Sequence, residues 1–139
     1  MRTPALTLAL ILATVGTTVA MDHGFQKGTE RSKFFQLLKR PDKYPDSCCG
    51  EADAYEVDID RHNPDGSYDV TIIDGTKQFP DGAFRTPIPG GTHIHVPATK
   101  VNPPEESRHN PTGYSWLFVT WYSDKVGTVF CLTAIPEGS

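Results

Sequence analysis

A tight turn between two alternating segments is the feature that most constrains the fold of this chain. In residues 55–60, apolar residues alternate with acidic ones such as Glu56, which predicts a strand with one apolar and one acidic face. Residues 63–66 read Asn-Pro-Asp-Gly, a turn in which Pro fixes φ at the second position and Gly accepts a positive φ at the fourth. Residues 68–72 alternate again, so the sequence predicts a β-hairpin over residues 55–72.

A helix is predicted before this hairpin. Thr29 has a side chain suited to cap it, and Phe34, Leu37 and Leu38 follow at the spacing of one helical face. Pro41 ends the helix near residue 40, because the residue before a proline is pushed out of the helical region. We expect the apolar face of this helix to pack on a sheet.

Further strands are predicted after the hairpin. Residues 92–96 alternate and stop at Pro97, and the apolar runs 114–122 and 128–135 are typical of the central hairpin of an antiparallel sheet. Between them, residues 102–113 are polar and rich in proline, and we expect a surface loop there. One helix followed by five or six strands indicates a mainly β (α+β) domain, either a small antiparallel sheet or a partly open barrel.

The first twenty residues have the layout of a secretory signal peptide. Arg2 gives a positive start, residues 5–15 are mostly apolar, and small residues stand at the positions that define a cleavage site. The apolar run is too short to span a bilayer as a mature helix, and no second run approaches that length. We therefore expect a signal peptide at 1–20, a single small β-rich domain at 21–139, and a soluble periplasmic or secreted protein without a transmembrane segment.

Length and charge narrow the classes of partner. The chain has 139 residues, enough for one domain, with 13 Lys and Arg against 17 Asp and Glu. Its net charge of −4 leaves no excess of cations to neutralise phosphates, so nucleic acid is not an expected partner.

The expected export determines how the three cysteines are interpreted. An oxidising compartment favours a disulfide, and we expect a long-range bridge from Cys131 to either Cys48 or Cys49. Closing a loop of about 80 residues in this way restricts the unfolded chain by about 4.5 kcal/mol. The leftover thiol is expected to be buried and inert, or to form a covalent dimer through an intermolecular bridge.

Two histidines suggest a metal site. His93 and His95 are two apart on a predicted strand, so both imidazoles point to the same face and could share a zinc or copper ion. A third ligand would come from His62, His109 or a carboxylate. The alternative is that the two histidines are solvent-side residues that flank a buried Ile94.

The sequence offers no assembled catalytic set, so we do not expect an enzyme or a bound organic cofactor. The spacing of the acids around the hairpin turn misses the calcium-loop pattern, because the glycine falls too late and no Glu closes the loop. The carboxylate pairs Glu51/Asp53 and Glu105/Glu106 accompany no predicted cleft. No Cys-x-x-Cys motif or positively charged helix N-terminus adjoins the cysteines to activate a thiol.

A series of short motifs runs through residues 34–136. In order, they are Phe34-Phe35-x-Leu37-Leu38-x-x-Pro41, Ser47-Cys48-Cys49-x-x-x-Asp53, Val96-Pro97-x-x-Lys100-Val101, Asn110-Pro111-Thr112-Gly113 and Cys131. This order resembles a group of small, uncharacterised exported bacterial proteins with a Cys-Cys-x-x-x-Asp-Cys signature. The resemblance implies export and disulfides but no reaction. Ala54 replaces the third cysteine of the signature, so one bridge expected in those proteins is absent here.

These observations lead to two functional hypotheses. The first is an exported, non-catalytic binding or structural module of the cell envelope, whose partner is an unknown protein or other envelope component. The alternative is a periplasmic transition-metal-binding protein that uses His93 and His95.

Overall fold

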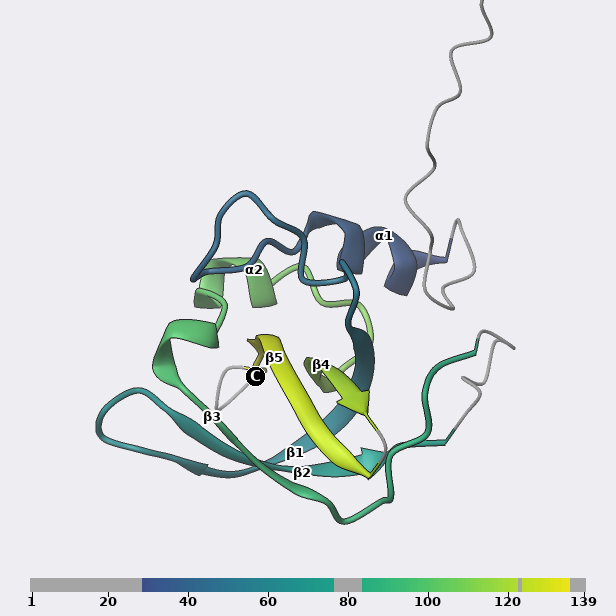
Figure 1. Cartoon of the computed structure of the whole chain (residues 1–139). Coiled ribbons are helices and arrows are strands. Elements are labelled where there is room, and N and C mark those ends of the chain that lie inside the picture. The colour runs from purple at the N-terminus through teal and green to yellow at the C-terminus, as the bar shows by residue number, and fades with distance from the viewer. Residues whose placement is uncertain (1–28, 77–83, 123, 136–139) are drawn as a thin grey trace, which may run out of the picture.

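Five antiparallel strands form one sheet that curls into a nearly closed barrel (Figure 1). The computed structural model describes residues 29–76, 84–122 and 124–135, so the predicted signal peptide at 1–20 lies outside the described residues. The strands are β1 (Asp53–His62), β2 (Tyr68–Asp74), β3 (His93–Val96), β4 (Ser115–Tyr122) and β5 (Lys125–Thr133). The helices are α1 (Glu30–Leu37), the short α2 (Pro104–Ser107) and a 3₁₀ turn η1 (Ala98–Lys100). The predicted mainly β class is confirmed.

The strand order across the sheet is β3-β2-β1-β4-β5. The first three strands form a meander, and β4 returns by a long connection to lie beside β1, which is a Greek-key arrangement. The first half of β1 pairs with β4 and its second half pairs with β2, so one bent strand joins the two halves of the barrel. The predicted hairpin of β1 and β2 is confirmed, and Gly66 in its turn has a φ of +86°.

The seam of the barrel lies between β3 and β5, which are in contact without forming a paired ladder. Val101, just after η1, makes a parallel bridge to Leu132 of β5 and so helps to close one end.

The inside of the barrel is filled by alternate residues of all five strands together with Ile88 from the segment between β2 and β3. We call this group the inner core: Tyr55, Val57, Val70, Ile72, Ile88, Ile94, Val96, Leu117, Val119 and Leu132. Strands β1 to β4 each contribute two residues that are two positions apart, as expected for strands with one face turned to the core, and β5 contributes Leu132.

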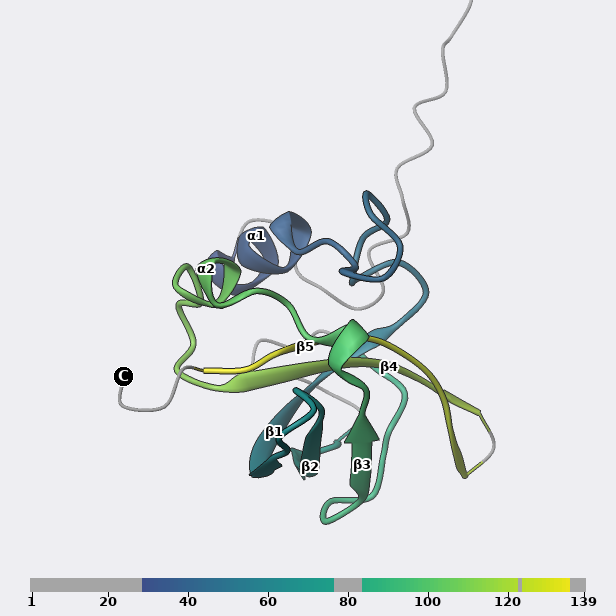
Figure 2. The ribbon, with the colours of Figure 1, turned by 90° about the vertical axis from the view of Figure 1, so that its left-hand side faces the viewer.

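A second apolar cluster covers part of the outer surface of the barrel, where α1 packs on β1 and β4. Figure 2 shows α1 and α2 on one side of β4 and β5, with β1, β2 and β3 on the other. We call this group the outer core: Phe34, Phe35, Leu38, Cys48, Ala52, Ala54, Trp116, Phe118 and Cys131. Because β4 contributes to both cores, its side chains are apolar on both faces.

The predicted helix is confirmed at its start and wrong at its end. Thr29 is the N-cap, and its hydroxyl accepts a hydrogen bond of 3.0 Å from the backbone N–H of Ser32. The helix ends at Leu37, because Leu38 is already extended and its carbonyl accepts a hydrogen bond from the backbone of Cys48. Leu37, which we expected in the apolar face, is 69% exposed, and Phe35 is fully buried in its place.

Two further expectations need correction. The predicted surface loop at 102–113 contains α2, and its first residue, Asn102, is buried. The last two strands do form a hairpin, but β1 occupies the centre of the sheet and β5 is at its edge. In the hairpin of β4 and β5, only β4 pairs with β1. A sequence pattern does not indicate which other strand a hairpin will pair with.

Candidate functional site

The disulfide connects the outer core to the last strand. Cys131 is bonded to Cys48, one of the two pairings that the sequence left open, and the two Cα atoms are 5.6 Å apart. Both side chains are fully buried. Cys48 comes from the loop after α1 and Cys131 from β5, so the bridge joins residues that are 83 positions apart.

Cys49 keeps its thiol. It is half-buried beside the outer core, and its Sγ donates a hydrogen bond of 3.2 Å to the backbone carbonyl of Phe35. The adjacent cysteines therefore face different partners, Cys131 for Cys48 and the end of α1 for Cys49.

The two predicted metal-ligating histidines lie on the outer surface of the barrel. His93 and His95 are exposed, and Ile94 between them is buried in the inner core, so the alternation expected of this strand is confirmed. The register places His93 opposite Thr71 and His95 opposite Asp69 on β2. We call the surface formed by these residues and their neighbours on β1 and in the turn after it the histidine face: Asp60, Asn63, Asp69, Thr71, His93 and His95.

A chain of hydrogen bonds reaches His93 across three strands. Its Nδ1 lies 2.7 Å from the hydroxyl oxygen of Thr71, and that hydroxyl donates a bond of 2.6 Å to the carboxylate of Asp60. Asp60 Oδ2 is itself 3.4 Å from Nδ1 of His93. Asp60 stands at an irregularity of β1, between the pairs of Ile59 and Arg61, where the strand has one residue more than its partner.

His95 is held by a carboxylate directly. Its Nδ1 lies 2.7 Å from Oδ1 of Asp69, and the other oxygen of Asp69 accepts a bond of 3.2 Å from the amide of Asn63. The hydrogen bond from His95 is the main cause that lowers the pKa of Asp69 below its usual range. This carboxylate is therefore ionised across the neutral pH range and accepts a hydrogen bond from the Nδ1–H group of His95.

The proposed third ligands do not join these two histidines. His62 stacks on Tyr68, with ring centroids 4.2 Å apart, and His109 follows α2. Within the described ranges, no three His, Cys, Asp or Glu side chains come together in a way that would hold a metal ion. The histidine face thus offers two imidazoles to a metal rather than a complete set of protein ligands.

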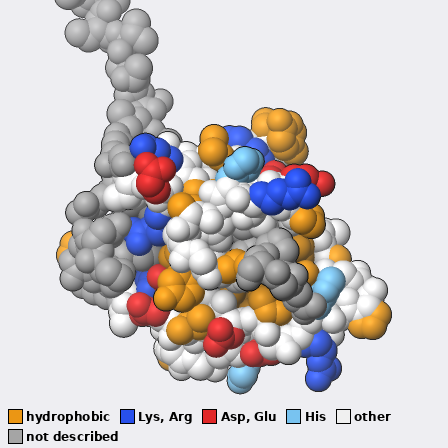
Figure 3. Space-filling view, turned by 180° about the vertical axis from the view of Figure 1, so that it is seen from behind, with side chains coloured by type: hydrophobic (Ala, Val, Ile, Leu, Met, Phe, Trp, Pro, Cys, Tyr) orange, Lys and Arg blue, Asp and Glu red, His pale blue; other side chains and the backbone are white. Residues whose placement is uncertain are grey.

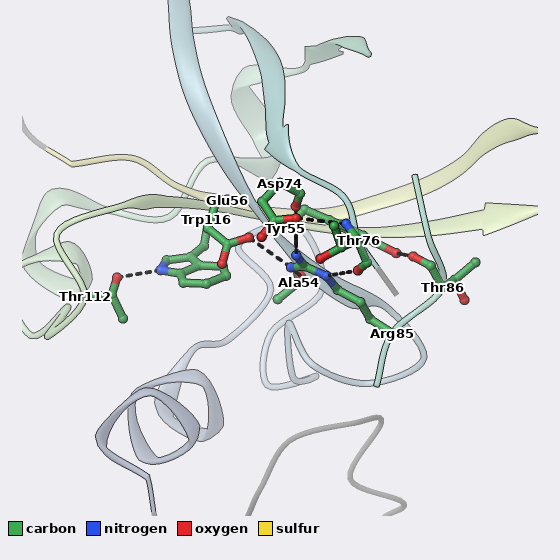
Figure 4. A network of polar contacts seen from close by, with 9 residues as sticks. All are labelled: Ala54, Tyr55, Glu56, Asp74, Thr76, Arg85, Thr86, Thr112 and Trp116. Carbon is green, nitrogen blue, oxygen red and sulfur yellow. Dashed lines mark hydrogen bonds and ion pairs between the residues drawn. The ribbon is translucent and has the colours of Figure 1, made fainter. Parts of the chain in front are cut away.

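A buried arginine forms the densest polar network in the described part of the chain (Figure 4). Arg85 is 4% exposed, and its Nη1 donates to the carbonyl of Ala54 at 2.8 Å and to the carboxylate of Glu56 at 3.0 Å. Its Nη2 donates to the carbonyl of Asp74 at 2.8 Å and its Nε to that of Thr76 at 2.8 Å.

The network also shows that the acidic face predicted for residues 55–60 is not exposed along its whole length. Glu56 is 9% exposed, because the segment containing Arg85 covers that end of β1. No sequence motif marks the pair, since Arg85 and Glu56 are far apart along the chain. A lone arginine beside apolar residues was the only available sign.

The segment around Arg85 is held by further contacts at the end of β2. The N–H of Ile88 donates to the carbonyl of Gly75 at 2.8 Å, and Tyr55 donates its hydroxyl proton to the carbonyl of Thr86. Burial is the main reason that the pKa of Tyr55 is raised above its usual range, so this hydroxyl stays protonated. A Cβ atom on Gly75 would lie 1.8 Å from the carbonyl oxygen of Ile88, so the segment docks closely only because residue 75 is glycine.

One carboxylate of each remaining candidate pair has a structural partner. Asp53 accepts a hydrogen bond from the backbone of Thr86, and Glu106 accepts one from the side chain of Asn102. Partial burial raises the pKa of Glu106. The partners of Asp53 and Glu106 are thus protein groups on the barrel and beside α2.

A cavity of about 580 Å³ opens at the end of the barrel beside the β1–β2 turn. Apolar side chains line most of it, and the stacked pair of His62 and Tyr68 forms one wall. Its volume lies within the range of small-molecule sites. No sequence motif predicts this cavity, because its walls come from β1, β2, the segment from Val101 through α2 and the residues after β5.

One face of the described surface carries mixed charge. Figure 3 shows acidic, basic and hydrophobic side chains interspersed on the face seen from behind. No helix in the described part of the chain has the length and apolar character that crossing a membrane requires.

Comparison with protein-family models, curated proteins and solved structures finds no match to this chain.

Proposed function

We propose that this chain is an exported, non-catalytic binding or structural module of the cell envelope. The observation that carries the proposal is the buried disulfide between Cys48 and Cys131. Structural disulfides form and persist in oxidising compartments and are rare in the cytosol. The signal-like segment at 1–20 supports the same location, as does the resemblance to small exported bacterial proteins.

The polar interior supports a structural rather than a catalytic use of its ionisable groups. Each nitrogen of the Arg85 guanidinium donates to a backbone carbonyl or a carboxylate of the protein. A catalytic group needs a face that is open to a substrate, and the contacts of Arg85 leave its side chain fully buried. The network thus serves to hold the segment after β2 on the barrel.

The cavity beside His62 and Tyr68 is the surface that we assign to binding. It combines apolar walls with an aromatic stack and a few polar groups, which is the usual composition of a ligand pocket. Asn102, which lines the cavity, is held by Lys39, Glu106 and Thr133, so this part of the pocket is preformed.

Cell fractionation tests the location. The full chain, expressed in a bacterium with a periplasm, is expected in the periplasmic fraction with a mass that lacks residues 1–20. A matched control in which Leu8 and Leu10 are both changed to Arg breaks the apolar run and should keep the chain in the cytosol. Recovery of the unprocessed wild-type chain from the cytosol would contradict the proposal.

Site-specific photo-crosslinking in cells tests the binding surface. A photoreactive residue in place of His62 should give a discrete adduct with an envelope component, because His62 lines the cavity. The same residue in place of Tyr44, which is 79% exposed and lies outside the cavity, is the control and should not give that adduct. Equal patterns at the two positions would count against the cavity as the binding surface.

A further inference from the structure

We propose that His93 and His95 form a transition-metal site on the outer face of β3, which binds Cu²⁺ more tightly than Zn²⁺ through the Nε2 atoms of both imidazoles. Asp60 and Asp69 act as positioning residues for the two rings. The inference rests on the histidine face alone and holds for the purified chain whether or not it is exported.

The hydrogen bonds at Nδ1 determine which nitrogen of each ring is available. A carboxylate only accepts hydrogen bonds, so the Nδ1 of His95 that lies 2.7 Å from Asp69 carries the proton. At His93, the hydroxyl of Thr71 donates its proton to a hydrogen bond with Asp60 and therefore accepts a hydrogen bond from Nδ1 of the imidazole. Both neutral rings are thus protonated at Nδ1, and each keeps the lone pair of Nε2 for a metal.

The same hydrogen bonds restrict the orientation of the rings. Metal-ligating histidines commonly donate their other N–H to a carboxylate, which selects the tautomer and increases the basicity of the ligating nitrogen. His95 donates to the carboxylate of Asp69 directly, and Asp69 is itself held by Asn63. His93 is connected to the carboxylate of Asp60 through the hydroxyl of Thr71. Hydrogen bonding at both Nδ1 atoms is what separates the pair from two ordinary exposed histidines.

The position of the pair on one strand allows both rings to reach a common ion. Residues two apart on a strand point to the same face, and their Cα atoms are about 6.6 Å apart. Ile94 between them is buried, so the backbone of the strand is held against the barrel and the spacing of the two Cα atoms is set by the strand.

The number of ligands indicates the kind of metal. Two imidazoles with the remaining positions filled by water make an open site, in contrast to the closed four-ligand set of structural zinc. Cu²⁺ accepts square-planar or tetragonal N,O coordination and stands at the top of the affinity order for divalent first-row metals. We therefore expect Cu²⁺ to bind more tightly than Zn²⁺.

Metal titration of purified protein tests the proposal. All variants should carry His23→Ala, because this histidine lies near the start of the predicted mature chain and would compete for Cu²⁺. In this background, His93→Ala and His95→Ala should each lower the affinity for Cu²⁺ by at least about tenfold, since each removes one of two ligands. His109→Ala is the matched control and should leave the affinity unchanged.

Spectroscopy locates the ion independently of affinity. Substoichiometric Cu²⁺ should broaden the ring resonances of His93 and His95 and leave those of His109 sharp. Asp69→Asn should lower the affinity about tenfold and shift the ¹⁵N resonances of the His95 ring away from the Nδ1-protonated tautomer. Unchanged Cu²⁺ affinity in the His93→Ala/His95→Ala double variant, or equal broadening at all histidines, would overturn the proposal.

Discussion

Arg85 and Glu56 form a buried ion pair of 3.0 Å that fastens the segment between β2 and β3 to the centre of the sheet. The guanidinium also lies 5.0 Å from the ring centroid of Tyr55, so one side chain contacts both faces of the end of β1. The three backbone carbonyls that Arg85 binds belong to β1 and to the end of β2. Arg85 therefore connects β1 to the end of β2 through its side chain, as the hydrogen bonds of an additional strand pairing would.

Arg85→Met should destabilise the protein by about 3–5 kcal/mol, because it leaves Glu56 buried without its cation. Denaturant unfolding measures this loss. Arg85→Met combined with Glu56→Gln should recover part of it, since the uncompensated charge is then gone. Lys33→Met, which removes an exposed ion pair with Glu30, is the control and should change the stability by less than about 1 kcal/mol. Similar losses of stability for Arg85→Met and Lys33→Met would show that the Arg85–Glu56 ion pair is not buried as described.

Gly75→Ala should destabilise the protein by about 1–3 kcal/mol, because a Cβ at this position would meet the carbonyl oxygen of Ile88 at 1.8 Å. The obstacle is backbone, so the segment after β2 must move. Gly90→Ala is the matched control, since its Cβ would find only an ordinary contact of 3.5 Å with the carbonyl of Ile73. Thermal unfolding of both variants checks the difference, and equal midpoints would be inconsistent with the close approach at Gly75.

Phe35→Ala should cost about 3–5 kcal/mol, whereas Leu37→Ala should change the stability by less than about 0.5 kcal/mol. Phe35 is fully buried and packs edge-on against Trp116 and Phe118, with ring centroids 4.8 and 5.0 Å apart. Leu37 is exposed at the end of α1. Urea unfolding of the two variants tests which face of α1 is buried. A larger loss for Leu37→Ala would restore the helical face predicted from the sequence.

The stability of the protein should fall between about pH 4 and pH 2 in part through Asp42. Burial opposes the ionisation of Asp42, but hydrogen bonds from Lys100 and Arg40 outweigh it and lower its pKa from 3.8 to about 2. A depressed pKa means that the unfolded chain takes up the proton first, so the stabilisation is present above pH 4 and is lost as the pH falls through 2. Asp42→Asn should lose less stability than the wild type over this interval. If the free energy of unfolding falls with pH at the same slope in the wild type and in Asp42→Asn, the result would contradict this role of Asp42.

Local patterns predicted the parts of the fold that depend on local interactions. The hairpin around Gly66 and the exposure of His93 and His95 around Ile94 follow from alternation and turn chemistry. The burial of Phe35 in place of Leu37 does not, because α1 ends where residue 38 bonds to residue 48 of a later loop. Propensity and spacing contain no information on such a distant partner.

The candidate sites likewise contain parts that local sequence patterns predicted and parts that depend on distant segments. The two histidines were found from their spacing, but the carboxylates that orient them come from β1 and β2, and Asp60 reaches His93 only because β1 is irregular at that point. The Arg85 network and the end cavity each combine several segments and left no sequence motif. For the cysteines, the sequence identified Cys131 as bridged and left the choice between Cys48 and Cys49 to the geometry of the loop after α1.

The covalent link between the loop after α1 and strand β5 is the central claim, and peptide mapping of the mature protein by mass spectrometry, after alkylation without reduction, tests it most directly. We expect one disulfide-linked pair of peptides that joins Cys48 to Cys131, with the alkyl label on Cys49 alone once the chain is unfolded. Three alkylated cysteines in protein recovered from the cell envelope, or a bridge that includes Cys49, would contradict this account.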